Sequence, residues 1–518
     1  MTDNRQLGAE GGVSPLRRIL VANRGEIALR IIRACHEEGL EAVAVYSDAD
    51  RLSPHVRAAN AAVALGAPPA AESYLDIAKL IAAATATGCQ AIHPGYGFLS
   101  ERETFARAVQ DAGLIFVGPP PAAIKAMGDK TEARRRMQAA GIPVVPGTAA
   151  PVRDAAEARR ETQRLGLPVL LKAASGGGGK GMRLVRALDE IESALRGAHS
   201  EAEKAFGAGA VYIEKYLERP RHIEIQILAD RSGRVVSLGE RECSIQRRHQ
   251  KLIEEAPSVA VTPALRRRLG EAATAAAGAV GYLGAGTIEF LLAPTGEFYF
   301  LEMNTRIQVE HPVTELVYGV DLVREQLRIA GGEPMRIRGG VSLEPRGHAI
   351  ECRITAEDPA NGFLPASGKV QYLRVPAGPG IRWDGGVEAG NDVTLFYDPL
   401  LAKLLAWGET REIAIRRMRR ALRELVIVGL PTSQSFHLWV MDDPEFRRCE
   451  IDITYLERVG ARLLEAPPPD DLVQAVAVAA AMLADERRTE AKADSRSDSP
   501  TVRRSAWADA ARREGLRS

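Results

Sequence analysis

The sequence predicts an α/β protein with a parallel sheet near its N-terminus and antiparallel sheets further along the chain. A strand, a helix and a second strand follow one another over residues 18–46, which is the βαβ order of a parallel sheet. Two apolar runs that flank a turn at residues 294–296 predict an antiparallel hairpin, and residues 348–407 indicate a further antiparallel sheet. At 518 residues the chain is too long for one hydrophobic core, so we expect roughly three or four units.

The composition excludes several classes of protein. Lys and Arg number 68 against 67 Asp and Glu, so no net field favours nucleic acid or an anionic membrane. No apolar run approaches the roughly 20 residues of a membrane span, and the first ten residues lack the apolar centre of a signal peptide. The five cysteines are scattered and form no Cys-x-x-Cys pair, which fits a reducing cytosol. We therefore expect a cytoplasmic protein that binds neither nucleic acid nor membrane.

The N-terminal βαβ unit predicts a Rossmann-like topology. Its turn carries a single glycine, Gly25, and lacks the Gly-x-Gly-x-x-Gly pattern, which disfavours dinucleotide binding. Residues 91–98 look like another strand that runs into a glycine-containing loop. Such loops lie at the carboxyl ends of strands, where α/β sheets bind ligands, although a plain turn would have the same composition.

A glycine tract at residues 176–179 lies between two strand-like runs, 167–172 and 183–185. A hairpin of this kind is mobile, and its backbone N–H groups can approach phosphates closely. It is not a Walker A loop, because Ala174 and Gly181 stand where that motif needs Gly and Ser or Thr. The alternative is a flexible linker.

Two polar stretches follow the glycine tract. Residues 211–217 form an apolar strand that ends in Glu214 and Lys215, which suit a hinge and an adenine edge reader or, equally, a solvated surface pair. Residues 240–255 are densely charged, and charge runs are usually solvated. The same run nevertheless contains side chains suited to an anionic substrate, namely Gln246, His249 and Lys251.

The hairpin around residues 294–296 predicts a metal site. Folding it about its turn places Glu289 opposite Glu302, where like charges repel. A divalent cation such as Mg²⁺, which binds carboxylate and amide oxygens, would relieve that repulsion, and Asn304 lies on the same face. If the chain stays extended, the face continues with Arg306, Gln308 and Glu310. The alternative is a surface hairpin with solvated charges.

The C-terminal part changes character along its length. An amphipathic helix is predicted over residues 413–425, after the antiparallel sheet. Prolines at 467–469 break the chain, and an Ala-rich helix is predicted over residues 472–483. Residues 485–504 are charged and Ser-rich, so we expect disorder there.

The chain resembles the biotin carboxylase component of biotin-dependent carboxylases, within the ATP-grasp superfamily. The matching stretches run from residue 17 to about 457 and are RRILVANRGEIALRIIRAC, HPGYGFLSE, MGDK, KAASGGGGKGM, EKYLERPRHIEIQ, RECSIQRRHQK, EMNTRIQVEHPVTE, HAIECRITAEDP and NDVTLFYDPLLAK. The resemblance implies an ATP-grasp fold in four parts. These are a Rossmann-like domain at 1–128, an ATP-grasp domain at 129–346 with a mobile glycine-rich lid at about 144–216, a C-terminal antiparallel-sheet domain at 347–460, and a helical or disordered tail at 461–518.

The resemblance also implies roles for individual residues. Those that would bind ATP are Lys130, Lys172, Gly178, Gly179, Glu214, Lys215, Tyr216, Leu217, His222, Gln246 and His249. Those that would hold Mg²⁺ or Mn²⁺ are Glu289, Glu302 and Asn304. Those that would hold bicarbonate are Lys251, Arg306, Gln308 and Val309. Glu310 would deprotonate bicarbonate, and Arg353 would stabilise the enolate form of biotin.

The implied reaction is the ATP-dependent carboxylation of biotin by bicarbonate through carboxyphosphate. The sequence has no Ala-Met-Lys-Met biotinylation signal, so biotin would arrive on a separate biotin carboxyl carrier protein. A homodimer that works with carboxyltransferase subunits is implied, and those subunits would choose acetyl-CoA, propionyl-CoA, another acyl-CoA or pyruvate as acceptor. The alternatives are another ATP-grasp carboxylate ligase and a non-catalytic scaffold that binds nucleotide. The Arg-Ile-Gln-Val-Glu segment and the intact catalytic positions favour the carboxylase.

Overall fold

The computed structural model describes residues 16–148, 150–173, 182–206, 210–248, 250–337 and 344–465, together with residues 478, 481 and 482. The chain divides into two compact units, Met1–Leu464 and Glu465–Ser518. The predicted glycine tract at 176–179 and the predicted disorder at 485–504 lie outside the described residues. No helix within the described ranges is long and apolar enough to cross a membrane.

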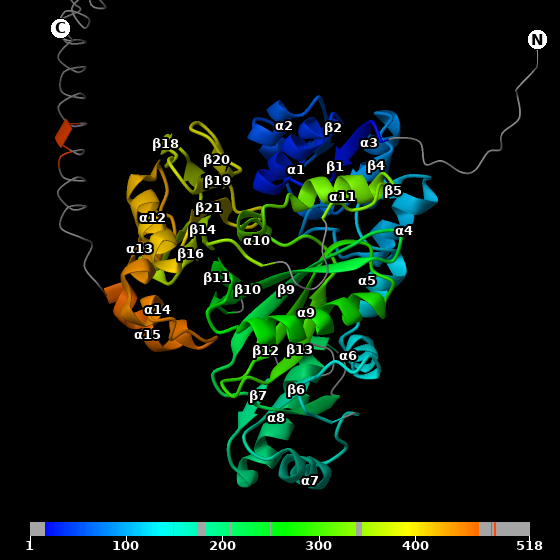
Figure 1. Cartoon of the computed structure of the whole chain (residues 1–518), viewed down its shortest axis with the longest axis vertical. Helices are drawn as coiled ribbons and strands as arrows, with labels where there is room; N and C mark the ends of the chain where they lie inside the picture. The colour runs from blue at the N-terminus through cyan, green and yellow to red at the C-terminus, as the bar shows by residue number, and fades with distance from the viewer. Residues whose placement is uncertain are drawn as a thin grey trace, which may run out of the picture. The chain divides into compact units, whose positions relative to one another are not determined.

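The first unit begins with a five-stranded parallel sheet of order β3-β2-β1-β4-β5 (Figure 1). Its strands are β1 (Arg18–Val21), β2 (Glu41–Ser47), β3 (Ala61–Gly66), β4 (Ala91–His93) and β5 (Ile115–Phe116). The helices of this region are α1 (Gly25–Glu37), α2 (Pro54–Ala58), α3 (Ile77–Ala86), α4 (Glu103–Asp111) and α5 (Pro121–Gly128). Successive side chains of β1 point to opposite faces, so Ile19 and Val21 join one core and Leu20 joins another. This sheet confirms the predicted βαβ unit.

A small antiparallel sheet of order β7-β6-β8 follows helix α6 (Lys130–Ala139). Its strands are β6 (Val169–Ala173), β7 (Arg183–Val185) and β8 (Val211–Lys215), and its helices are α7 (Ala155–Leu165) and α8 (Ile191–Phe206). Strand β6 pairs antiparallel with β7, which confirms the predicted hairpin around the glycine tract. A separate hydrophobic core that includes Val169, Leu171 and Ile213 packs between this sheet and its helices. The sheet and its helices therefore form a subdomain with its own core.

The largest sheet has eight strands in the order β13-β12-β9-β10-β11-β14-β21-β19, all paired antiparallel (Figure 1). Its strands are β9 (Arg221–Ala229), β10 (Val235–Arg247), β11 (Gln250–Ala256), β12 (Gly284–Leu292), β13 (Phe298–Asn304), β14 (His348–Thr355), β19 (Ile381–Gly385) and β21 (Leu400–Gly408). Helix α9 (Pro263–Gly278) packs on β9, β10 and β12. Because β11 pairs with β14, the sheet runs without a break across the domain boundary predicted at residue 346.

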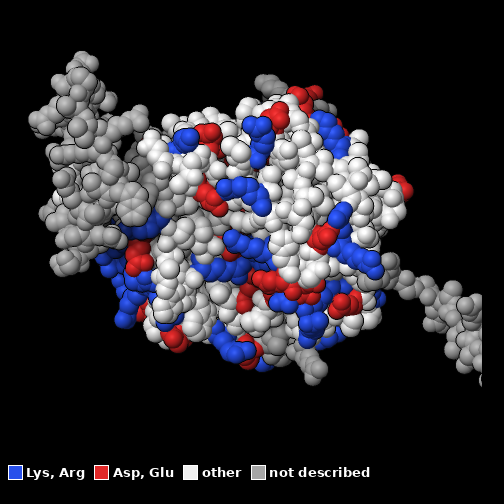
Figure 2. Space-filling model, turned by 90° about the horizontal axis from the view of Figure 1, so that it is seen from above, with Lys and Arg blue, Asp and Glu red and all other residues white. Residues whose placement is uncertain are grey.

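Helices α10 (His311–Tyr318) and α11 (Leu322–Ala330) follow β13 and pack on strands of the large sheet. The C-terminal part adds helices α12 (Arg411–Glu424), α13 (Gln434–Asp442), α14 (Pro444–Arg447) and α15 (Tyr455–Glu465). Its short strands are β15 (Glu357–Asp358), β16 (Leu364–Pro365), β17 (Gly368–Lys369), β18 (Tyr372–Arg374), β20 (Asp392–Val393) and β22 (Val426–Val428). Helix α12 confirms the helix predicted at 413–425. On the face drawn in Figure 2, basic and acidic side chains are interspersed.

One glycine of β10, Gly239, lies at an irregularity in the pairing of β10 with β9. Gly239 has φ +67°, and the pairing of β9 with β10 shifts its register between Ser237 and Glu240. This is the geometry of a β-bulge, which re-aims the side chains that follow it. A Cβ atom at Gly239 would lie 1.8 Å from the hydroxyl of Tyr318, so only glycine fits there.

Gly239→Ala should therefore lower the free energy of unfolding by about 3 kcal/mol, because it adds both a strained φ and an overlap with Tyr318. Gly281→Ala is the matched control, since Gly281 has φ +58° with open space around it and its replacement should cost only about 1 kcal/mol. Urea-induced unfolding of both variants measures the difference. Equal losses would show that the bulge accepts a side chain.

Candidate functional site

A fully buried arginine, Arg241 of β10, lies at the centre of the candidate site. Its guanidinium donates hydrogen bonds to side chains from β9, β12, α10 and the segment before α10. The acceptors are Gln226 Oε1 at 2.7 Å, Thr314 Oγ1 at 2.9 Å, Thr287 Oγ1 at 3.1 Å, Gln308 Oε1 at 2.7 Å and the carboxylate of Glu224. A buried guanidinium is tolerated only when its donors are satisfied, so these elements are held together around it.

Lys251 of β11 lies between three carboxylates. Its ammonium group is 2.8 Å from Glu289 Oε1 and 2.7 Å from Glu310 Oε1, and it also bonds the second oxygen of Glu224. Burial alone would lower the pKa of Lys251, but these carboxylates raise it well above the ordinary value. Lys251 is therefore a permanent cation in the middle of the site.

Glu310 lies between Lys251 and a second cation, Arg353 of β14. Arg353 Nη2 is 3.0 Å from Glu310 Oε2, and Arg353 Nε donates to Glu254 Oε1 at 2.6 Å. Burial raises the pKa of the Glu310 carboxyl, but Lys251 and Arg353 outweigh burial and hold it below the ordinary value. Glu310 is therefore ionised at neutral pH and available to accept a proton, with a basicity that both cations reduce.

The predicted hairpin is confirmed. Strands β12 and β13 pair so that Glu289 lies directly opposite Glu302. Glu289 is buried and accepts hydrogen bonds from Asn304 and Gln308 at 2.8 Å each, and His222 Nε2 lies 2.9 Å from its other oxygen. Glu302 is solvent-exposed and has no hydrogen bond or ion pair within the described part of the chain.

The carboxylate of Glu302 suits a metal ion. Although solvent reaches it, the surrounding protein and the facing Glu289 raise the pKa of Glu302, so its charge lacks a partner. With Glu289 and the amide oxygen of Asn304 it forms a set of oxygen donors of the kind that Mg²⁺ prefers. Two other clusters of possible ligand atoms lie nearby, His222 with Glu224 and Glu289, and Glu224 with Cys243 and Glu310. Their carboxylates, including Glu289, which also belongs to the first set, contact the Lys251 ammonium group.

The chain after Asn304 does not stay extended. Strand β13 ends at Asn304, and α10 begins at His311. Glu101, from the loop after β4, accepts hydrogen bonds from Thr305 N at 3.1 Å and Arg306 Nε at 2.8 Å, and it anchors this turn. Arg306 nevertheless reaches the same cluster as Gln308 and Glu310, because Arg306 Nη2 bonds Asn304 Oδ1 at 3.0 Å.

The predicted nucleotide-binding residues divide between the small sheet and the large one. Lys172 of β6 pairs with Glu214 of β8, and the ammonium group of Lys215 donates to two backbone oxygens of residues 166–167 at 2.9 Å each. In the large sheet Gln246 Nε2 lies 2.9 Å from His222 Nδ1. Lys130 is the first residue of α6, and Tyr216 and Leu217 follow directly after β8. Three predicted residues lie outside the described ones: Gly178, Gly179 and His249.

Sequence reasoning missed three residues of the site: Glu101, Glu224 and Arg241. Arg241 falls in a charged run that is typical of a solvated surface, and Glu224 alternates with apolar residues like any half-exposed strand. Neither pattern indicates full burial. The ion pair between Arg241 and Glu224, which makes the burial of both charges possible, cannot be seen in the sequence.

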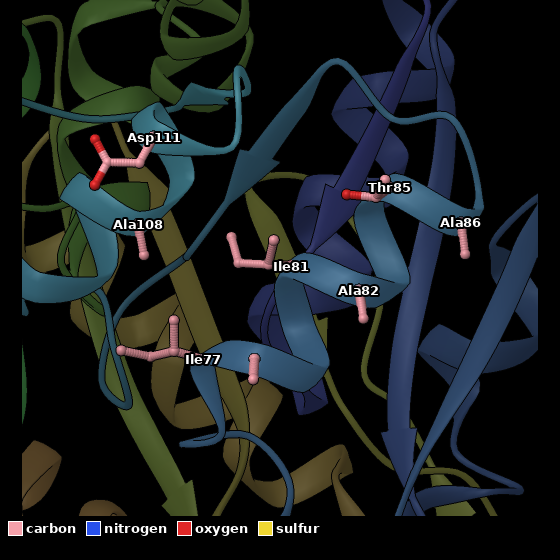
Figure 3. Close-up of a pocket in the computed structure, with 8 residues that line it drawn as sticks. Ile77, Ile81, Ala82, Thr85, Ala86, Ala108 and Asp111 are labelled. Carbon is pink, nitrogen blue, oxygen red and sulfur yellow. The ribbon is translucent and has the colours of Figure 1, made fainter.

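An apolar groove elsewhere in the structure is not the candidate site. It has a volume of about 890 Å³, and Figure 3 shows side chains from α3 and α4 around it. Its lining residues are Ile77, Ala78, Ile81, Ala82, Thr85, Ala86, Ala108 and Asp111. Thr85 and Asp111 are the polar residues in this lining, and it contains no cation that could bind a phosphate.

Three family models match the chain. Residues 15–124 match the biotin carboxylase N-terminal domain, residues 129–338 the ATP-binding domain of the carbamoyl-phosphate synthase L chain, and residues 351–458 the biotin carboxylase C-terminal domain. The biotin carboxylase of Nostoc sp. is 53% identical over 443 residues, which covers 86% of this chain and 99% of that protein. The chain belongs to the biotin carboxylase family.

Other relatives agree. The biotin carboxylase of Haemophilus influenzae is 51% identical and covers 86% of this chain and 98% of its own length. The solved biotin carboxylase of Campylobacter jejuni is 45% identical, with a TM-score of 0.80, and covers 86% of this chain and 99% of its own. Membership of the family confirms the predicted ATP-grasp fold, the predicted ligase class and the predicted reaction, ATP-dependent carboxylation of biotin.

Glu302→Gln should leave the apo protein as stable as the wild type or slightly more stable at pH 8, because it removes a carboxylate whose raised pKa disfavours the charged form. Stabilisation by Mg²⁺ and ATP should fall sharply if Glu302 binds the metal as predicted, since one oxygen donor of the predicted set loses its charge. Melting temperatures measured with and without both ligands test this. Glu297→Gln, at the exposed turn of the same hairpin, is the control that should behave like wild type. A large fall in the apo melting temperature would make Glu302 a structural residue.

Proposed function

We propose that this chain carboxylates biotin on a separate carrier protein through the residues of the cluster around Lys251 and Glu310. The observation that carries the proposal is the convergence of a proton acceptor, two flanking cations and a metal-type oxygen set within one buried cluster. The biotin carboxylase domain of Hydrogenobacter thermophilus 2-oxoglutarate carboxylase, 45% identical with a TM-score of 0.81, has been solved with MgADP and bicarbonate, which supports the same ligands here.

Glu289, Glu302 and Asn304 would hold the divalent cation, Mg²⁺ or Mn²⁺. When bound, the cation neutralises phosphate charge and offers oxygen ligands a fixed geometry. The unpartnered carboxylate of Glu302 supports this assignment. Lys130 would supply a further positive charge near the phosphates, since its charge already acts on Glu302.

Lys251, Arg306, Gln308 and the backbone of Val309 would bind bicarbonate, with Glu310 as the base. Bicarbonate must lose a proton before it attacks the terminal phosphate of ATP, and carboxyphosphate with ADP is the product of that attack. As an anion, bound bicarbonate would draw Lys251 away from Glu310 and so raise the basicity of the carboxylate. The cations that surround the site would stabilise the charge that gathers during the attack.

Arg353 would act in the second half of the reaction. Carboxyphosphate would break into CO₂ and phosphate, and the phosphate would take the proton of the N1′ atom of biotin. Negative charge then develops on the ureido oxygen, and a guanidinium aimed there would stabilise that charge. The N1′ atom then takes up the CO₂ released from carboxyphosphate. Arg353 is partly buried, with its side chain 13% exposed, and it already contacts Glu310, which supports this placement.

The small sheet would act as the lid over ATP. Lys172, Glu214 and Lys215 lie on its strands β6 and β8, and the glycine tract connects β6 to β7. A closing lid would exclude water from carboxyphosphate, which is unstable in water. We place Gly178, Gly179, Tyr216, Leu217, His222, Gln246 and His249 in the same nucleotide-binding role.

Biotin carboxylases work with carrier and carboxyltransferase components. For this chain we propose a cytoplasmic homodimer with a biotin carboxyl carrier protein and carboxyltransferase subunits as partners. The related proteins include biotin carboxylases, a component of the pyruvate carboxylase of Methanothermobacter thermautotrophicus and a component of the methylcrotonoyl-CoA carboxylase of Oryza sativa. These names point to different acceptors, so the acceptor would be set by the carboxyltransferase.

The purified chain should release ADP slowly from Mg²⁺–ATP, and bicarbonate and free biotin should each increase the rate. A coupled ADP-release assay measures this, with chloride at equal ionic strength as the control for salt. If neither compound changes the rate, the proposed function is wrong.

Arg353→Ala should keep bicarbonate-dependent ATP cleavage and lose carboxybiotin formation, because Arg353 serves the biotin step. Glu310→Gln should lose both, because without the base no carboxyphosphate forms. Phosphate release and carboxybiotin are measured in parallel for each variant. Arg374→Ala, an exposed arginine outside the cluster, should resemble wild type. Equal loss of both activities in Arg353→Ala, with unchanged ATP affinity, would contradict this division of roles.

A further inference from the structure

A buried carboxyl group on β14, two residues before Arg353, has no hydrogen-bond partner among the described residues. Glu351 lies in the middle of β14, is 0% exposed, and neither of its side-chain oxygens makes a hydrogen bond within the described part of the chain. An unpaired carboxylate costs several kcal/mol to bury, so the group requires a physical explanation. The proposed reaction gives Glu351 no direct role.

Glu351 faces a second acidic residue. It pairs directly across the sheet with Glu254 of β11, whose Oε1 accepts from Arg353 and whose Oε2 is also without a partner among the described residues. Opposed side chains on neighbouring strands lie about 5 Å apart at Cβ, which is within hydrogen-bonding reach of two glutamate side chains. The two side chains are not hydrogen-bonded to each other in this structure, and a hydrogen bond between them would give both carboxyl groups a partner.

The nearby cations are already taken. Arg353 binds Glu254 and Glu310, and Lys403 of β21 binds Glu26 at 3.1 Å and the backbone oxygen of Val309 at 3.0 Å. The charged groups that act on Glu351 are Lys403, Glu254, Arg353 and Glu310, and Lys251 acts on Glu254. Helix α10, which packs on β14, carries His311 and Glu315. Burial raises the pKa of Glu351 well above the ordinary value and that of Glu254 to about 7.

We propose that Glu351 is a neutral carboxylic acid that donates its proton to a hydrogen bond with Glu254 and thereby positions Arg353. This inference rests on the proposed function of Arg353. Glu254 and Glu310 share the same Nη2 atom of Arg353. When Glu310 takes the proton of bicarbonate it loses its charge and releases Arg353, and only Glu254 then holds the guanidinium. Glu351 keeps Glu254 in that position and shares its charge, which leaves Arg353 free to act on the biotin oxygen.

The first test measures stability against pH with Glu351→Gln, whose amide is a neutral donor at every pH. A carboxyl whose pKa is raised by folding weakens the fold progressively as pH rises above its unfolded value, and the amide does not. The melting temperature of Glu351→Gln should therefore match wild type near pH 5 and exceed it by a margin that grows towards pH 8.5. A variant that melts below wild type at every pH would mean that Glu351 is ionised and partnered, and the proposal would be overturned.

The second test separates positioning from structure. Glu351→Leu should lower the rate of carboxybiotin formation by about 10- to 100-fold, the loss typical of removing a group that orients a functional residue. ADP release that depends on bicarbonate alone, and the KM for ATP, should not change. Glu351→Gln should restore carboxybiotin formation to near the wild-type rate.

Glu357→Leu is the matched control, because Glu357 is a buried carboxyl on β15 with an unpartnered oxygen and no bond to Arg353. It should keep the wild-type ratio of carboxybiotin to ADP. The same ratio in Glu351→Leu would refute the positioning role. A wild-type chain without bicarbonate-dependent ADP release would instead refute the proposed function, and the pH dependence of stability would still test the protonation of Glu351.

Discussion

The arrangement of the site depends on the burial of one charge, the guanidinium of Arg241. Its donors must be satisfied without water, and they are satisfied by side chains from β9, β12, α10 and the segment before α10. Glu224 extends this network, because one of its oxygens pairs with Arg241 and the other with Lys251. Through Lys251 the same network reaches Glu289 and Glu310, so the metal-type oxygen set and the proton acceptor are positioned together.

Charge pairing divides the carboxylates of this region into two groups. Most lie against a cation, and this keeps them ionised despite burial, as for Glu310 and Glu289. Glu302 and Glu351 have no such partner within the described ranges. The two residues differ in their exposure to solvent. Glu302 is open to solvent and can receive a metal ion, whereas Glu351 is enclosed by protein and can relieve its charge only by holding a proton.

Much of the fold and part of the site could be predicted from local sequence. The turn at residues 294–296 predicts the hairpin, but its register next to the turn, with Leu292 opposite Phe298, would place Leu301 opposite Glu289. A bulge between Glu289 and Phe290 shifts the register by one residue and brings Glu302 opposite Glu289. The βαβ order of residues 18–46 likewise predicts a parallel sheet, since antiparallel strands need no helical crossover. The extended continuation to Glu310 was wrong: the chain turns after Asn304, and Glu101, about two hundred residues earlier in the sequence, accepts hydrogen bonds from that turn, a long-range contact that local patterns do not indicate.

By itself the sequence determined the N-terminal parallel sheet, the hairpin around residues 294–296 and, through its resemblance to a known family, the reaction. Only the tertiary structure decided which charges meet. Strand order in the eight-stranded sheet brings β9, β10, β11 and β14 side by side, although they come from distant parts of the chain. Alternation along a strand shows which residues share a face, but it does not show which neighbouring strand that face will meet. Arg241, Glu224 and Glu351 therefore look like surface charges in sequence, and their burial follows from the pairing of strands that local patterns do not specify.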